Sequence, residues 1–548
     1  MRLRAGDRRD EAGGARRMTG AILTLILAGI VALALVAKRL HVAYPVVFVI
    51  GGLIVALIPG VPDVQLQPDL VFLLFLPPLI FGDGWTTDYR SFMRYRRPIF
   101  SLAIGLVVFT SVAVALFSHA TMGISLAVGF VLGGILSPTD AVATDAIAEE
   151  LTLPAPLATV LSGESLINDA SGLVIYRFGV AAAATGAFSL LAALGRFAFA
   201  IVGGVAIGIG GAWCIAKLMR WIRETGLTDT VIAVSISLVT PFALYVPADA
   251  IGASGVIAAM TGGIYLNRKS SQIFDAESRL AAGSVWNLLF FTFNGAAFVL
   301  IGLELRTILR ALPMYSVWTL ISWGIAISLL LVVVRFVWCF AVIYIGGVIR
   351  GRSGELPPWQ AIFVLSYAGM RGIVSLAAAL AIPDTIASGR PFPDRPLILF
   401  ITFTVILFSL VGEGLTLPWF IRRFGDVLGG DDAEVERMLA VARVRTAQAA
   451  RDHLRTLEGT FTTVEWEVVG RIHAGYEQTI EHFELHAGAD GGEGDLDAAH
   501  HVVESRLRSA AYRAEREALA RLRRSGEISD HAFRELEWRI DLAESRLS

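Results

Sequence analysis

The sequence has little cysteine and little charge for its length. Its 548 residues include two cysteines, Cys214 and Cys339, and both lie within apolar runs. A disulfide framework is therefore not indicated, and two buried thiols are more typical of packing than of metal binding. Charged residues make up 17% of the chain and hydrophobic residues 55%. Because soluble proteins carry roughly a quarter charged residues, this composition excludes an ordinary soluble domain.

The sequence also lacks the motifs of soluble catalysis. It contains no phosphate-binding Gly-Lys-Ser/Thr, no cluster of metal ligands and no nucleophile elbow. We therefore predict a protein that is not an enzyme and that uses no cofactor. The net charge of -2 averages two unlike regions. It gives no sign of a nucleic-acid partner, and we expect none.

Long hydrophobic runs dominate residues 19–423, whereas residues 424–548 are dense in Arg, Glu and Asp. Thirteen apolar segments recur in the first region, each near the roughly 20 residues that cross a bilayer core. They lie at about 19–37, 43–60, 68–82, 98–119, 123–147, 155–183, 187–217, 228–247, 250–266, 284–304, 313–347, 357–383 and 396–420. We predict a transmembrane domain at 19–423 and a cytoplasmic helical domain at 424–548.

The basic residues between spans predict the orientation of the chain. One set of alternate loops is rich in Lys and Arg, with Lys38, Arg39, Arg90, Arg94, Arg96, Arg97, Lys217, Arg220, Arg223, Arg268, Lys269, Arg279, Arg350, Arg352, Arg422 and Arg423. The other set holds Arg306, Arg310, Arg390 and Arg395. The first set should be cytoplasmic. This places the C-terminus on the cytoplasmic side of the cell membrane and the N-terminus on the outer side.

The first 18 residues form a basic tail that contradicts this orientation if it is translated. A start at Met18, directly before the first span, removes the conflict, so both Met1 and Met18 remain candidate starts. In the C-terminal domain we expect helices at 432–457, 462–486, 497–524 and 530–547, with a Gly-rich acidic linker at 488–495. This domain serves packing or self-association, or it is a solvated helical tail.

The stretch Gly163–Ala170 places two carboxylates, Glu164 and Asp169, inside an apolar segment. Ionisable groups inside a bilayer cost about 2.5–3.5 kcal/mol each and are functional candidates by default. On a helix, Ser165 and Asp169 share one face, and Glu164 and Asn168 share the adjacent face. Asp169 can hold a dehydrated cation or a proton but not both well, which suffices for exchange. Polar residues bonded between helices are the alternative.

A second interruption is Ser137-Pro138-Thr139-Asp140. Proline lacks an N–H and frees backbone carbonyls, which with the Thr139 hydroxyl are plausible cation ligands. Asp140 would offset the positive end of the following half-helix. The alternative is a proline kink with an N-capping aspartate.

A third interruption, Gly369–Ser375, places Arg371 between two glycines. It lies seven spans after the second, so the two broken helices run in opposite directions, as an inverted repeat requires. We predict that Arg371 pairs with Glu164 and positions helices; the alternative is an arginine that snorkels to the interface. Arg335 has no assignable partner, and Glu413 is expected near a span end.

At these residues the sequence resembles cation:proton antiporter family 1, the bacterial NhaP-like and animal NHE-like sodium/proton exchangers. The resemblance covers residues 19–423 and adds Phe298–Leu303, Phe403–Phe408 and Gly414–Leu417 to the three interruptions. It implies a scaffold or dimerisation domain, a mobile six-helix core with crossed broken helices, and a homodimer. One departure is Glu413, where Gln is expected.

The resemblance also implies residue roles. Asp169 would bind the ion and the proton, Thr139, Ser165 and Asp140 would contribute to the cation site, and Glu164 would pair with Arg371. Asn168 before Asp169, rather than two aspartates, is associated with electroneutral exchange. Asn168 therefore belongs to the same candidate site.

The hypothesis is an all-α polytopic membrane protein that exchanges a monovalent cation, Na⁺ first, for H⁺ by alternating access, for intracellular pH and Na⁺ homeostasis. K⁺/H⁺ exchange and another ion-coupled solute carrier are open alternatives on the same scaffold. A channel, which would need no obligatory proton coupling, is a further alternative. A membrane scaffold with a signalling C-terminal domain would leave the carboxylates without a function.

Overall fold

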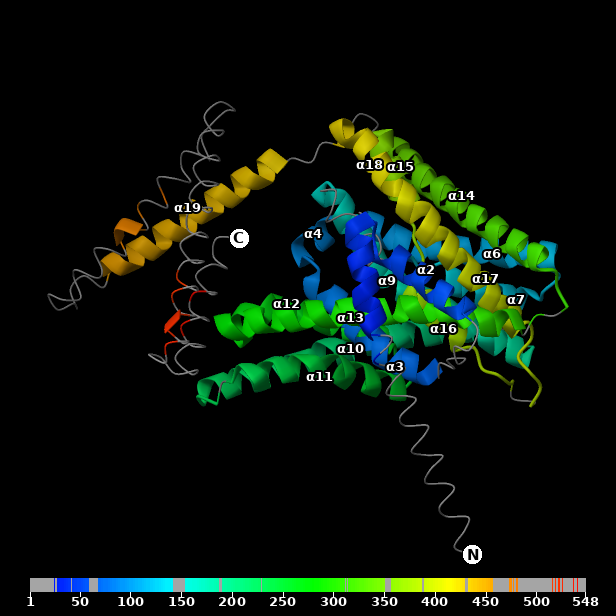
Figure 1. Ribbon diagram of the computed structural model, residues 1–548, viewed down its shortest axis with the longest axis horizontal. Helices are drawn as coiled ribbons and strands as arrows, with labels where there is room; N and C mark the ends of the chain where they lie inside the picture. Colours follow the sequence, from blue (N-terminus) through cyan, green and yellow to red (C-terminus); the bar gives the residue numbers. More distant parts are fainter. Residues whose placement is uncertain are drawn as a thin grey trace, which may run out of the picture. The chain divides into compact units, whose positions relative to one another are not determined.

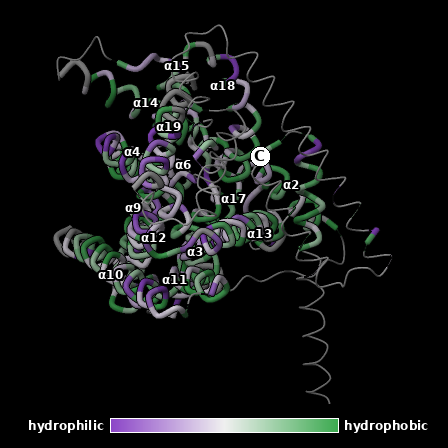
Figure 2. The backbone as a smooth tube through the Cα atoms, turned by 90° about the vertical axis from the view of Figure 1, so that its left-hand side faces the viewer, coloured by the Kyte–Doolittle hydropathy of each residue, from purple (hydrophilic) through white to green (hydrophobic). Residues whose placement is uncertain are grey.

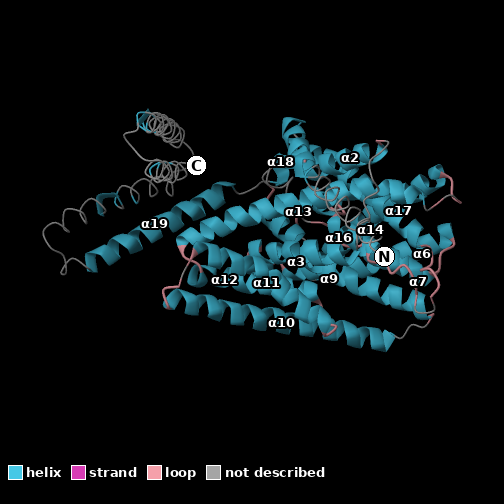
Figure 3. Cartoon of the chain, turned by 60° about the horizontal axis from the view of Figure 1, so that its bottom comes forward, coloured by secondary structure: helices cyan, strands magenta, loops and turns pink. Residues whose placement is uncertain are grey.

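The computed structural model describes residues 24–456, except 25–26, 41, 59–67, 141–152, 187–189, 228, 311, 313, 350–355, 387–388 and 429–431, and scattered residues from 473 to 540. The chain divides into two compact units, Met1–Gly430 and Asp431–Ser548. The division falls a few residues after the boundary expected at residue 423, because the last helix of the first unit continues to Leu428. Within the described residues, regular structure is helical, apart from an isolated bridge between Thr385 and Pro391 (Figure 3).

The apolar runs of the sequence form the helices of the first unit (Figure 1). Residues 27–40 are helical. The helices and π-helical turns that follow up to residue 273 are α2 (Tyr44–Leu57), α3 (Pro68–Thr86), α4 (Tyr89–Arg94), α5 (Arg96–Phe100), η1 (Ser101–Leu106), α6 (Val107–Met122), α7 (Leu126–Leu136), α9 (Ala155–Thr185), α10 (Leu190–Glu224), α11 (Thr230–Ala250) and α12 (Gly255–Ile273).

The rest of the first unit continues in the same way. Its elements are α13 (Ala276–Arg310), α14 (Val317–Ile349), α15 (Trp359–Tyr367), α16 (Ile373–Leu380), α17 (Arg395–Phe408), η3 (Ser409–Glu413) and α18 (Gly414–Leu428). Hydrophobic residues run along most of their length, α13 and α10 included (Figure 2). The predicted all-α polytopic membrane fold is confirmed.

Six of the described helices are long and apolar enough to cross a membrane by length and composition. They are Arg96–Met122, Gly195–Glu224, Thr230–Ala250, Glu277–Leu300, Val317–Gly346 and Arg395–Gly425. Two shorter apolar helices, Tyr44–Ala56 and Leu126–Leu136, accompany them. The predicted count of thirteen spans is not confirmed, because broken helices are short and α9 is interrupted by polar residues.

The helices of the first unit pack as two groups. In one, α12 packs against α3, α10 and α11, and α13 against α2. In the other, α7 packs against α6 and α9, and α14 against α15 and α17. Fewer contacts join the groups, chiefly those of α13 with α17 and of α16 with α3. Figure 1 shows α10–α13 side by side, with α14 and α18 apart from them.

Two chain interruptions meet inside the second group. Helix α7 ends at Leu136 and is followed by the non-helical Ser137–Asp140, and residues 368–372 separate α15 from α16. The Asp140 N–H donates to the Met370 carbonyl at 2.7 Å, which joins the two breaks directly. The half-helix expected after Pro138 falls on residues 141–152, outside the described residues.

The second unit begins with α19 (Asp432–Thr456), close to the helix expected at 432–457. The helices expected at 462–486, 497–524 and 530–547 and the linker at 488–495 lie largely outside the described residues, as do the N-terminal 18 residues.

Candidate functional site

Helix α9 carries a group of buried polar residues. It begins directly after Pro154 and ends before Gly186, whose φ of 69° gives the left-handed C-terminal cap that glycine favours. Glu164, Ser165, Asn168 and Asp169 are all buried along it. A buried polar group costs free energy unless it is partnered. The partners of each side chain therefore indicate its role.

Glu164 pairs with Arg335 of α14, and not with Arg371. The two guanidinium nitrogens of Arg335 donate to both carboxylate oxygens, one at 2.7 Å from Oε2. Arg335 is only 1% exposed. The same guanidinium donates to the Leu365 carbonyl and, at 3.4 Å, to that of Ala368, at the C-terminal end of α15. Arg335 therefore neutralises Glu164 and caps the negative end of a broken helix.

The predicted Glu164–Arg371 pair is wrong. Arg371 is buried, and its Nε donates at 3.0 Å to the carbonyl of Leu136, the last residue of α7. Its guanidinium also donates to the Gly369 carbonyl. An arginine beside two helix breaks finds exposed backbone carbonyls closer than a carboxylate on another helix. Arg371 thus ties the end of α7 to the break before α16, which keeps its predicted role of positioning helices.

Asp140 caps the N-terminus of α16. Its Oδ2 accepts from the Ile373 N–H at 3.1 Å, where the unpaired amides of a helix start carry positive charge. A Cβ at Gly372 would overlap this carboxylate, so the close approach requires glycine. The sequence predicted that Asp140 would offset a half-helix terminus. The terminus it contacts belongs to the other broken helix.

Gly372→Ala should disrupt the contact between Asp140 and the N-terminus of α16. The added methyl group displaces Asp140 from α16, and overpacking of this kind costs about 1–3 kcal/mol. We expect a lower unfolding temperature for the purified variant in detergent. Gly210→Ala in α10 is the control, since a Cβ there meets nothing within 4 Å. Equal unfolding temperatures for Gly372→Ala and wild type would contradict the close contact.

Thr139 connects the first break to α9. Its hydroxyl accepts from the Asn168 amide at 2.8 Å and donates to Glu164 Oε1 at 3.4 Å. The Asn168 amide also reaches the Thr139 carbonyl at 3.4 Å, while its own oxygen finds no donor among the described residues. The structure therefore joins three predicted site residues, Thr139, Glu164 and Asn168, in one hydrogen-bonded network. Ser165 lies one turn before Asp169 on α9, and it is buried.

Asp169 stands outside this network. Its side chain is 7% exposed and accepts no hydrogen bond from any described residue. The carboxylates that act on it electrostatically are Asp140 and Asp83, and both repel its charge. Within the described part of the chain, no three His, Cys, Asp or Glu side chains cluster as metal ligands do. Asp169 is therefore a buried acid without a counter-charge among the described residues.

Three residues of this region were missed or misplaced from the sequence. Asp83 lies on α3, which continues to Thr86 beyond the expected span end at residue 82. Its acidic side chain directly after an apolar run was the available signal. Glu413, expected near an interface, is buried at 4% exposure in the π-helical turn η3. It acts electrostatically on Arg371. Arg335 was noted as intramembrane, but no pattern in the sequence assigned its partner.

Taken together, a multi-helix membrane fold, two meeting helix breaks and an unneutralised buried acid define the class of ion-coupled membrane transporters. The model of the family described as "Sodium/hydrogen exchanger, transmembrane" matches residues 22–423. The chain belongs to this sodium/hydrogen exchanger family.

Relatives and solved structures agree with this assignment. The chain is 34% identical over 540 residues to an uncharacterized Na⁺/H⁺ exchanger of Mycobacterium tuberculosis, covering 96% of each. It is 33% identical over 407 residues to the sodium, potassium, lithium and rubidium/H⁺ antiporter of Bacillus subtilis, covering 72% of this chain and 61% of that one. The fold is similar to the sodium proton antiporter MjNhaP1 of Methanocaldococcus jannaschii, with a TM-score of 0.57, 18% identity and coverage of 75% and 99%.

Proposed function

We propose that this chain exchanges a monovalent cation, Na⁺ first, for H⁺ across the cell membrane by alternating access. The observation that carries the proposal is Asp169, a buried carboxylate without a hydrogen-bond donor among the described residues and repelled by two further acids. Such a group is neutralised by a proton or by a cation, and each excludes the other. Family membership supports the same activity.

Thr139, Ser165, Asn168 and Asp140 complete the proposed ion site. Hydroxyl, carbonyl and carboxylate oxygens are the ligands that hard cations such as Na⁺ prefer. Asp140 is occupied at the α16 terminus, so its contribution is to attract the cation electrostatically. Ser165 adds a hydroxyl one turn from Asp169. Na⁺ is cargo of this site, and we propose no resident cofactor.

The exchange is proposed to be electroneutral, one cation for one proton. Asn168 is uncharged and hydrogen-bonded to Thr139, and Glu164 is neutralised by Arg335. Asp169 is then the group on α9 that changes its charge state during transport. An Asp169 carboxylate that holds neither a proton nor a cation is costly inside the membrane. The protein therefore changes between its two states with one or the other bound, which couples the cation flux to the proton flux.

The two helix groups supply the proposed alternating access. Because fewer contacts join the groups than hold each together, the group with α7, α9 and α16 can shift against the group with α10–α13. A homodimer, a cytoplasmic C-terminus and an outer N-terminus remain part of the proposal. The role in pH and Na⁺ homeostasis follows from the exchange itself.

Everted membrane vesicles test this function. With a respiration-driven pH gradient, added Na⁺ should release protons from vesicles that contain the protein, and K⁺, Li⁺ and Rb⁺ should be compared in the same assay. The antiporter of Bacillus subtilis named for all four cations motivates that comparison. Cation flux without proton movement would indicate a channel. A response that requires an organic solute would indicate another carrier, and either result would overturn the proposal.

A further inference from the structure

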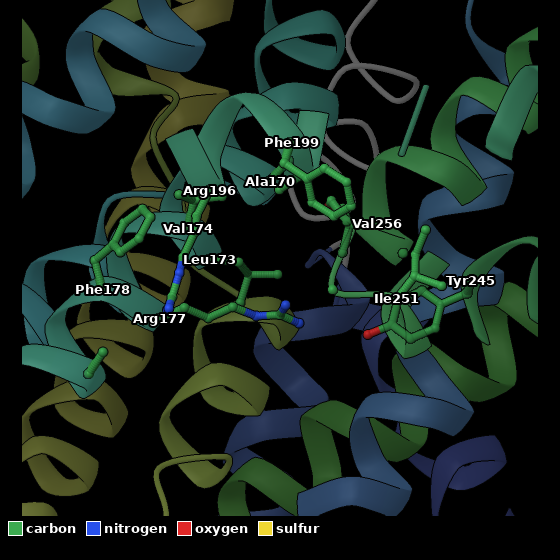
Figure 4. Close-up of a pocket in the computed structure, with 15 residues that line it drawn as sticks. Ala170, Leu173, Val174, Arg177, Phe178, Arg196, Phe199, Tyr245, Ile251 and Val256 are labelled. Atoms are coloured by element: carbon green, nitrogen blue, oxygen red, sulfur yellow. The ribbon is translucent and has the colours of Figure 1, made fainter. Parts of the chain in front are cut away.

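A cavity of about 410 Å³ lies outside the ion site, between α9, α10 and the α11–α12 connection. Figure 4 shows Arg177 and Arg196 on one side of this cavity and Tyr245 and Ile251 on the other. Ala170, which follows Asp169 in the chain, also lines it. The cavity thus lies where the two helix groups face each other.

The cavity carries more positive than negative charge. Arg177 donates to the Asp249 carboxylate at 2.9 Å, which joins α9 to α11. Arg196 is exposed and makes no hydrogen bond or ion pair with any described residue. The Asp249 carboxylate therefore pairs with Arg177 and leaves the charge of Arg196 uncompensated among the described residues. Guanidinium groups are suited to bind phosphate oxygens through paired N–H donors.

The remaining walls are apolar. They are formed by Leu173, Val174, Phe178, Phe199, Ile251 and Val256. Phe199 and Ile251 are each more than half exposed, at 52% and 58%. The cavity thus opens toward the poorly buried surface of α10, only 17% of whose apolar window is buried in the chain. An occupant with hydrocarbon chains could leave the cavity along this surface.

Arg196 lies near the start of α10, opposite to the basic end of that helix. Arg196 and Arg223 are about 40 Å apart along the helix at about 1.5 Å per residue, more than a bilayer core. With the basic end of α10 in one headgroup region, this length allows Arg196 to reach the opposite one.

From these observations we infer that the cavity binds an anionic phospholipid, its phosphate between Arg177 and Arg196 and its acyl chains along α10. The apolar opening favours a lipid over a free anion, because a soluble phosphate would leave the aromatic and aliphatic walls without a partner. Such a lipid would contact both helix groups. The inference concerns binding and does not depend on the proposed exchange activity.

The test compares thermal unfolding of purified protein in neutral detergent with added phosphatidylglycerol, phosphatidylcholine of the same chains, or inorganic phosphate. Phosphatidylglycerol should raise the unfolding temperature of wild type and of Asp169→Asn alike. Arg196→Gln and Arg177→Gln/Arg196→Gln should lose at least half of that rise, and Arg196→Lys should keep most of it. Arg97→Gln is the matched control, since Arg97 is an exposed arginine elsewhere in the same unit.

An equal rise in the double variant, or an equal rise with phosphatidylcholine, would overturn the site. Inorganic phosphate that reproduces the whole rise would overturn the assignment to a lipid. Because Arg196 is exposed and unpaired within the described residues, Arg196→Gln is expected to fold and carries the test by itself if the double variant does not.

Discussion

Asp169→Asn should reduce cation-induced proton flux in everted vesicles by at least about 100-fold, while the protein remains in the membrane. Asparagine fills nearly the same space but can neither ionise nor release a proton. Since Asp169 accepts no hydrogen bond from the described residues, the substitution breaks no contact there, and the unfolding temperature should hold or rise. Relief from the repulsion by Asp140 and Asp83 gives the sign of that change.

A matched control separates this effect from the loss of any carboxylate. Asp384 lies at the surface, with its side chain 85% exposed and paired to Arg395. Asp384→Asn should retain wild-type exchange, because exposed ion pairs contribute little. Wild-type flux from the Asp169→Asn variant would show that Asp169 is not part of the transport site.

Glu164→Gln and Arg335→Met each destabilise the folded protein strongly, by about 3–5 kcal/mol, because each leaves a buried charge without its partner. The pair is bidentate, and both side chains are 2% exposed. The double variant should lose much less than the sum of the two, which a double-mutant cycle of unfolding free energies measures. Arg335 also caps α15, so its substitution should cost more than that of Glu164.

A second cycle discriminates between the two arginines. Glu164→Gln with Arg371→Gln should give a clearly smaller coupling energy, because Arg371 contacts backbone carbonyls and not Glu164. Equal coupling in both cycles would argue against the pairing in the structure. Additive losses in the Arg335 cycle would argue against it more directly.

Much of the fold followed from hydrophobic run lengths. The segments predicted at 155–183 and 228–247 correspond to α9 and α11, and the two breaks lie at Pro138 and Arg371 as expected. These features depend on local chemistry: apolar length, a missing proline N–H, and glycines beside a charge. The number of spans does not follow as easily, since a broken helix divides one apolar run into short pieces.

The partners of buried charges could not be predicted in the same way. Helical spacing placed Glu164 and Asp169 on different faces of α9. It contains no information on which arginine side chain lies at the same depth as Glu164. Arg335 and Arg371 both lie in apolar segments of the sequence. The packing of α14 against α15 decides which of the two pairs with Glu164, and the sequence does not show that packing. Asp83 was missed for a related reason: its charge was taken as the end of a span, whereas α3 continues to Thr86.

The local pattern at the breaks has a common physical cause. Each interruption exposes backbone groups, and charged side chains from other elements satisfy them. Arg371 caps the end of α7, Arg335 caps the end of α15, and Asp140 caps the start of α16. With Glu164 paired and Asn168 neutral, the remaining unneutralised acid on α9 at this level is Asp169.

The most direct test of that conclusion is a measurement of proton release on Na⁺ binding to the purified protein. Calorimetric titration in two buffers of different ionisation enthalpy counts the protons that leave when Na⁺ enters. Near the pH at which Asp169 is protonated, wild type should release close to one proton for each Na⁺ bound, and Asp169→Asn should release none. Na⁺ binding to wild type without proton release, or equal release from Asp169→Asn, would contradict competition at this carboxylate.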